Sequence, residues 1–149
     1  MSPMINVILY NRVSSDDQIK NFSIENQIEL NTDYAKRMGW NVVSVIEDDG
    51  YSAKNFDRPG WKKLKDIVYG SKIKVHKVYF VRWDRFGRNT EFCLRVIRQF
   101  GERGTEINAV QQPIDFGTPI SKHVLNTYLT TGEVERDNIR IRTSEGIRK

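Results

Sequence analysis

Two serine hydroxyls and several arginines in this sequence could together carry out phosphoryl transfer. Ser14 and Ser15 closely follow Arg12, and further arginines occur at Arg58 and in the run 82–88 (RWDRFGR). An activated hydroxyl is a nucleophile, and the planar guanidinium group of arginine matches the oxygens of a phosphate. Cations around the phosphorus stabilise the negative charge of the transition state. This combination predicts a site at which a serine attacks a phosphate.

The segments that carry these residues follow stretches that are typical of buried strands. β-branched and aromatic residues predict strands at 5–13, 41–46, 77–81 and 106–110. Helical spacing and capping residues predict helices between them. The first expected helix has Ser23 as its N-cap and ends before Gly39, and the second begins at Pro59 and ends before Gly70. A third is capped by Asn89 or Thr90, and a fourth runs from Thr118 onward. The alternation predicts an α/β fold with a mostly parallel central sheet of four to five strands, flanked by helices and ending in a long C-terminal helix.

In open α/β sheets, ligands bind beyond the carboxyl ends of the strands. Polar residues stand at or after three of the predicted strands, so we expect their side chains at one edge of the sheet. The first strand brings Tyr10, Arg12, Ser14, Ser15 and Gln18; the second brings Asp48, Asp49, Ser52 and Arg58; the third brings Arg82, Asp84, Arg85 and Arg88.

Composition sets the class of protein. The chain has 149 residues, 38% of them hydrophobic, which suits one globular domain. The net charge of +5 favours a polyanionic partner. A single cysteine, Cys93, rules out a disulfide within the chain and, with only two histidines, argues against a Cys/His zinc site. No secretory signal and no stretch of about 20 apolar residues is visible, so we expect a cytoplasmic protein without a membrane partner.

Four blocks of the sequence resemble the serine site-specific recombinases, the resolvase/invertase family. The first is Tyr10-x-Arg12-Val13-Ser14-x-x-x-Gln18, where the nucleophile would be Ser14. The other blocks are 48–52 (DDGYS) with 57–60 (DRPG), 82–90 (RWDRFGRNT), and 133–136 (EVER) with 142–146 (RTSEG). They occur in the family's order over almost the whole chain.

The resemblance implies a role for each matching residue. Ser14 would attack the scissile phosphate and form a 5′-phosphoserine bond, with a free 3′-hydroxyl and no need for a cofactor, a metal or ATP. Ser15 is the rival nucleophile. Arg12, Arg58, Arg85 and Arg88 would surround the phosphate, and Asp84 would orient the arginines or assist proton transfer. The implied DNA-phosphate or second-tier residues are Tyr10, Gln18, Gln27, Asp48, Ser52 and Arg136.

The resemblance also implies how the chain is organised. Residues 1–149 would be a catalytic domain, with an α/β core over about 1–117 and a long oligomerisation helix over about 118–146. From the residues alone, this helix could pack on its own sheet or on another subunit, and the little domain left to cover its apolar stripe favours an exposed stripe. The resemblance implies that the helix pairs two copies into a dimer, and that two dimers form the tetramer that exchanges strands of double-stranded DNA. The family's C-terminal DNA-binding region is expected to be absent from this chain.

Two alternatives come from the residues alone. A non-catalytic α/β regulatory or DNA-binding module, such as a receiver-like domain, would need an acidic pocket for phosphorylation, whereas the first strand ends in Arg-Val-Ser. A metal-dependent nuclease could use Asp48 and Asp49, but the nearby arginines would repel a cation. The motifs leave open whether the reaction is resolution, inversion, integration or transposition.

Overall fold

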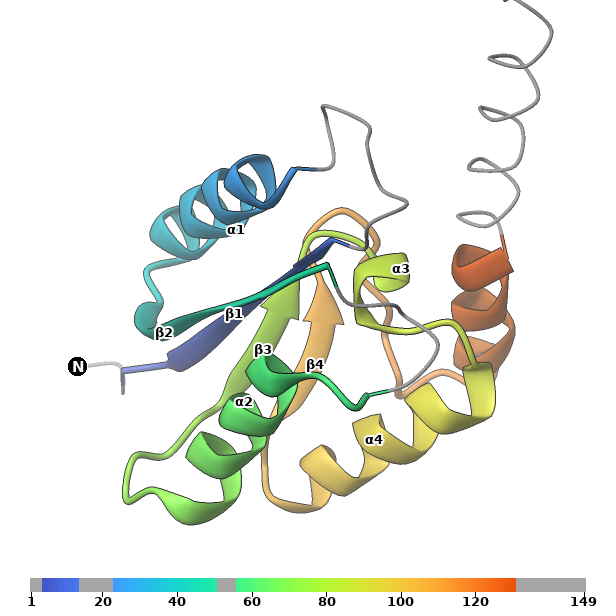
Figure 1. Cartoon of the computed structure of the whole chain (residues 1–149). Helices are drawn as coiled ribbons and strands as arrows, with labels where there is room; N and C mark the ends of the chain where they lie inside the picture. The colour runs from blue at the N-terminus through green and yellow to red at the C-terminus, as the bar shows by residue number, and fades with distance from the viewer. Residues whose placement is uncertain (1–3, 14–22, 51–55, 131–149) are drawn as a thin grey trace, which may run out of the picture.

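The computed structural model describes residues 4–13, 23–50 and 56–130, which contain one sheet of four parallel strands in the order β2-β1-β3-β4 (Figure 1). The predicted α/β class and parallel sheet are confirmed. In chain order the elements are β1 (Asn6–Val13), α1 (Ile24–Met38), β2 (Asn41–Asp49), α2 (Pro59–Gly70), β3 (Lys77–Phe80), α3 (Trp83–Phe86), α4 (Thr90–Glu102), β4 (Glu106–Ala109) and a helix over 121–130.

Helices cover both faces of the sheet. Figure 1 shows α1 on one face, and α2 and α4 on the other, with the helix 121–130 beside the start of α4. The larger hydrophobic cluster lies on the α2 and α4 side and includes Trp61, Phe80, Trp83 and Phe100. Cys93 is fully buried in this cluster, and burial raises the pKa of its thiol to about 12.

The ends of α1 are set by the residues that the sequence indicated. The Ser23 side chain accepts a hydrogen bond from the backbone N–H of Asn26 at 3.2 Å and caps the first turn. Gly39 ends the helix in the left-handed region at φ 75°, where its N–H reaches the carbonyls of Ala35 and Lys36. The Ser23 cap fixes where α1 starts, and therefore where Gln27 lies.

The prediction that the second strand ends at Ile46 and gives way to a polar loop was wrong. β2 continues to Asp49, paired with β1 up to Val13 opposite Asp49. Along this stretch Ile46 and Asp48 are buried while Glu47 and Asp49 are exposed. The pairing with β1 satisfies the backbone, and it outweighs the low strand propensity of three consecutive acidic residues.

The apolar stripe near the C-terminal end of the described chain packs on its own domain. Leu125 and Leu129 are buried in the larger cluster, and Val124 and Tyr128 pack against it. The prediction that this stripe is left exposed was therefore wrong for these four residues, because the larger cluster of the same domain takes them up. Ile120, just before the helix, remains 61% exposed. Positions 131–146 of the predicted long helix lie outside the described residues.

Among the described helices, none combines the length and the apolar character needed to cross a bilayer.

Candidate active site

β1 lies between β2 and β3, so its carboxyl end is surrounded by protein on both sides. Tyr10 and Arg12 are two residues apart on this strand and therefore lie on the same face, and both side chains are almost completely buried. In the register of the sheet, Arg12 stands opposite Asp48 of β2. The sheet therefore brings the first and second predicted groups of site residues together.

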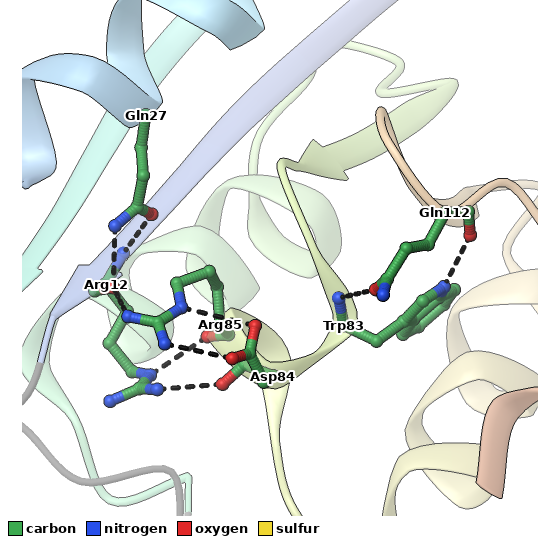
Figure 2. Close-up of polar contacts among 6 residues, drawn as sticks. All are labelled: Arg12, Gln27, Trp83, Asp84, Arg85 and Gln112. Atoms are coloured by element: carbon green, nitrogen blue, oxygen red, sulfur yellow. Dashed lines mark hydrogen bonds and ion pairs between the residues drawn. The ribbon is translucent and has the colours of Figure 1, made fainter. Parts of the chain in front are cut away.

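The guanidinium group of Arg12 binds the backbone of α3. Its Nε donates to the Arg85 carbonyl at 2.9 Å, and its Nη2 donates to the Asp84 carbonyl at 2.8 Å (Figure 2). Arg85 in turn forms an ion pair with Asp84, at 3.0 Å between Nη2 and Oδ2, and its Nη1 donates to the Arg12 carbonyl at 3.4 Å. Asp84 therefore holds Arg85 by direct contact.

Gln27 of α1 holds the backbone of Arg12 from the other side. Its Oε1 accepts from the Arg12 N–H at 3.1 Å, and its Nε2 donates to the Arg12 carbonyl at 3.0 Å (Figure 2). This two-way bond fixes the peptide groups on both sides of the Arg12 Cα. It also secures the chain two residues before Ser14.

A second cluster joins Tyr10, Asp48 and Arg58. The Tyr10 hydroxyl donates to Asp48 Oδ2 at 2.7 Å and accepts from Arg58 Nη1 at 2.9 Å. Arg58 Nη2 donates to the Phe86 carbonyl at 2.8 Å, so this cluster also holds α3. Burial raises the pKa of the Tyr10 phenol and lowers the pKa of Arg58 from their ordinary values.

Asp48 caps α2 from the neighbouring strand. Arg58 stands at the N-cap position but makes no side-chain cap, and the Asp48 carboxylate instead accepts from the backbone N–H groups of Gly60 at 2.7 Å and Trp61 at 3.0 Å. A Cβ at Gly60 would lie 2.7 Å from Asp48 Oδ1, so a glycine is needed for this close approach. Asp48 therefore acts as a capping group for α2.

Replacing Asp48 with asparagine should lower the free energy of unfolding by about 2–4 kcal/mol, because a buried charge that accepts three hydrogen bonds is lost. Urea unfolding followed by circular dichroism measures this change. Asp49→Asn is the matched control, since Asp49 is the next residue of β2 and is exposed. Equal midpoints for the two variants would contradict the capping role of Asp48.

The charges at this edge favour an anion. The buried charged side chains of the described residues are three arginines, Arg12, Arg58 and Arg85, and two aspartates, Asp48 and Asp84, which leaves one excess positive charge (3 − 2). Arg88 adds a half-buried guanidinium directly after α3. Buried charge without a counter-ion is unfavourable, so an anionic ligand here gains binding energy.

Two guanidinium N–H groups near α3 lack acceptors among the described residues. The buried Nε of Arg58 lies in a guanidinium that stacks over the Phe56 ring at 4.5 Å, and the Nε of Arg88 is also buried. Donors of this kind suit the oxygens of a phosphate. Within the described residues, the Arg88 side chain has no hydrogen bond or ion pair, whereas Arg12 and Arg85 have several.

Eight of the predicted site residues lie at one edge of the sheet or in and next to α3. Four others lie outside the described residues. The first group is Tyr10, Arg12, Gln27, Asp48, Arg58, Asp84, Arg85 and Arg88. The second group is Ser14, Gln18, Ser52 and Arg136, and the rival nucleophile Ser15 lies outside as well.

Sequence reasoning missed what holds the arginines. Arg12 and Arg58 bind the carbonyls of Asp84, Arg85 and Phe86. Every residue has a backbone carbonyl, so the sequence does not indicate which carbonyl an arginine binds. It also missed Gln112, which contacts Trp83 at the start of α3. Within the described residues, no group of three or more His, Cys, Asp or Glu side chains could hold a metal ion.

Comparison with known proteins places this arrangement in context. The model of the family described as "Resolvase, N terminal domain" matches residues 7–149. The serine recombinase gin of Escherichia phage Mu is 28% identical over 143 residues, covering 95% of this chain and 65% of its own length. The chain spans about half to two thirds of the length of the curated relatives that it matches.

Two solved structures share the fold. The N-terminal catalytic domain of TP901-1 integrase matches with a TM-score of 0.68 and 26% identity, over 89% of this chain and 97% of that one. A resolvase family site-specific recombinase from Streptococcus pneumoniae matches with a TM-score of 0.66 and 30% identity, over 95% of both chains.

Proposed function

Because the chain belongs to the resolvase N-terminal domain family, we propose that it is the catalytic domain of a serine recombinase that cleaves and rejoins double-stranded DNA. The observation that carries the proposal is the cluster of buried arginines around the carboxyl end of β1, and Ser14 directly follows β1 in the chain. The relatives supply the reaction class, since they are named DNA-invertase, serine recombinase and resolvase.

The proposed reaction is a transfer of the phosphodiester from sugar to serine. The Ser14 hydroxyl loses its proton, its oxygen attacks the scissile phosphorus, and the bond from phosphorus to the 3′-oxygen breaks. The 3′-oxygen takes up a proton, and a 5′-phosphoserine remains. The attack of a 3′-hydroxyl on the phosphoserine reverses these steps, so rejoining conserves the bond energy and requires no ATP.

The described residues divide the work in this mechanism. Arg85 and Arg88 supply positive charge and N–H donors to the phosphate, and Asp84 holds the Arg85 fork in place. Arg12 joins β1 to α3, and Arg58 joins α3 to Tyr10. Asp48, Tyr10 and Gln27 position these arginines, and we assign Gln18, Ser52 and Arg136 to the same site from the motifs alone.

The proposal includes double-stranded DNA and further copies of this chain as partners. The net charge of +5 and the anion-favouring edge support DNA. The long helix expected over about 118–146 would pair two copies through its positions after residue 130, since the apolar residues of its described part already pack on the core.

A metal-free test of covalent chemistry separates the proposal from its two alternatives. The purified protein is incubated with sheared genomic DNA of its source in EDTA, denatured in detergent, and analysed for protein bound to DNA 5′ ends. We expect a covalent adduct in EDTA. Cleavage that appears only with magnesium and leaves no adduct would favour the nuclease, and binding without cleavage in either condition would favour the non-catalytic module.

A further inference from the structure

α3 is a single helical turn that depends on other segments for its position. It carries Asp84 and Arg85, yet Arg82 at its N-cap position makes no side-chain cap. The Gln112 side chain supplies the cap from the segment after β4, because its Oε1 accepts from the Trp83 backbone N–H at 2.8 Å (Figure 2). One turn has few internal hydrogen bonds, so such an external bond weighs heavily.

Gln112 holds Trp83 at two points. Besides the cap, the Gln112 carbonyl accepts from the Trp83 indole Nε1 at 2.8 Å, so the backbone and the side chain of one residue are both fixed (Figure 2). Trp83 is fully buried, and its ring packs edge-on against Phe80 at 4.9 Å and Phe116 at 5.8 Å. We refer to this pair, Gln112 with Trp83, as the α3 clamp.

The α3 clamp acts on the arginines through the backbone. The carbonyls of Asp84 and Arg85 hold the Arg12 guanidinium, and the Asp84 carboxylate holds Arg85. A shift of α3 by a fraction of an ångström therefore moves both arginines relative to the chain that leads to Ser14. Gln112 itself is 7% exposed and stands on the far side of Trp83 from these arginines (Figure 2). We therefore place it outside the proposed phosphate site.

We propose that Gln112 is a positioning residue for DNA cleavage, which acts through Trp83 and α3 to set Arg12 and Arg85. This inference rests on the proposed function. A misplacement of about 1 Å at a catalytic group can cost about 100-fold in rate. The clamp thus contributes to the rate of the chemical step, whereas DNA affinity, which depends on many phosphate contacts, stays the same.

Three substitutions and one control test the clamp. Gln112→Met keeps the length of the side chain and removes the acceptor; Gln112→Asn keeps an amide but is one methylene too short. Gln112→Glu keeps an oxygen that can accept from the Trp83 N–H. Gln99→Met is the matched control, because Gln99 is an exposed glutamine on α4.

Two readouts separate positioning from general stability. The first is the single-turnover rate of adduct formation at saturating DNA, with the DNA concentration for half-saturation measured in parallel and with rates scaled to the folded fraction. The second is hydrogen exchange of the Arg12 Nε–H by NMR, which reports the bond to the Arg85 carbonyl without reference to activity. The Asn11 side-chain amide, bonded to the Ile46 carbonyl at 3.0 Å, is the internal reference.

We expect Gln112→Met and Gln112→Asn to slow adduct formation at least about tenfold with unchanged half-saturation, and to speed exchange of the Arg12 Nε–H but not of Asn11. Gln112→Glu keeps the acceptor for the Trp83 N–H, so its rate per folded molecule should lie closer to the wild-type rate than the rates of the Met and Asn variants. Wild-type rates or unaltered Arg12 exchange in the Met and Asn variants would overturn the inference. If the wild-type protein forms no adduct, the proposed function fails together with this role, and altered exchange alone would leave the clamp as a purely structural contact.

Discussion

Replacing Ser14 with alanine is expected to abolish the covalent protein–DNA adduct and to leave the fold unchanged. The change removes one oxygen, and with it the nucleophile, so the yield should fall by at least about 1,000-fold. Ser14 directly follows Val13, the last residue of β1, and Arg12 two positions earlier is held by α1 and α3. The loss of one small hydroxyl should cost little stability.

The neighbouring serine provides the matched control for this experiment. Ser15→Ala removes an equivalent hydroxyl one residue later, and we expect it to retain adduct formation. Circular dichroism and the salt dependence of DNA binding show whether either variant has altered the fold or the phosphate contacts. An adduct at wild-type yield from Ser14→Ala would reject the assignment, and a loss confined to Ser15→Ala would transfer the role to Ser15.

Local signals predicted the elements whose ends are set by nearby residues. Ser23 and Gly39 bound α1 as expected, because caps act within one turn of the chain. β2 was predicted three residues too short, because its last residues are held by pairing with β1 rather than by their own propensity. α3 has four residues, which is about one turn and therefore too short for an apolar period to repeat.

The sequence predicted which residues meet at the candidate site, but it did not predict the hydrogen bonds that join them. Strand order in a parallel sheet brings the carboxyl ends of β1, β2 and β3 to one edge, so residues as distant as Arg12 and Arg85 were expected to meet. The partners of Arg12, by contrast, are main-chain carbonyls, and the cap of α3 comes from Gln112, which has no fixed spacing from Trp83 in any helical or strand pattern. These contacts depend on the tertiary fold alone.

The connections also divide the arginines into two kinds. Arg12 and Arg58 use guanidinium N–H groups to bind carbonyls of α3. These N–H groups hold the protein together and are not available to a phosphate. Arg85 uses two N–H groups on Asp84. Substituting any of these three should therefore reduce stability as well as rate. Arg88 is half-buried and outside these bonds, which makes it the arginine whose substitution reports most directly on the phosphate.

Replacing Arg88 with lysine should slow adduct formation by about 100- to 1,000-fold with little change in the free energy of unfolding. The loss of one positioned donor to a transition state typically has this size, and lysine presents a point charge where the planar fork of arginine offers several N–H groups. The Arg88 Nε is buried and has no acceptor among the described residues, so lysine removes a donor that a phosphate oxygen can use and leaves no protein group unsatisfied.

Single-turnover adduct formation at saturating DNA measures this effect, with urea unfolding as the test of stability. Arg98→Lys is the matched control, because Arg98 is exposed on α4 and carries the same charge. Arg85→Lys should lose both rate and stability, since its ion pair with Asp84 is almost completely buried. The contrast between the two variants is the decisive result: if Arg88→Lys reacts within about threefold of the wild-type rate, charge alone suffices at this position, and the guanidinium fork of Arg88 has no part in the transition state.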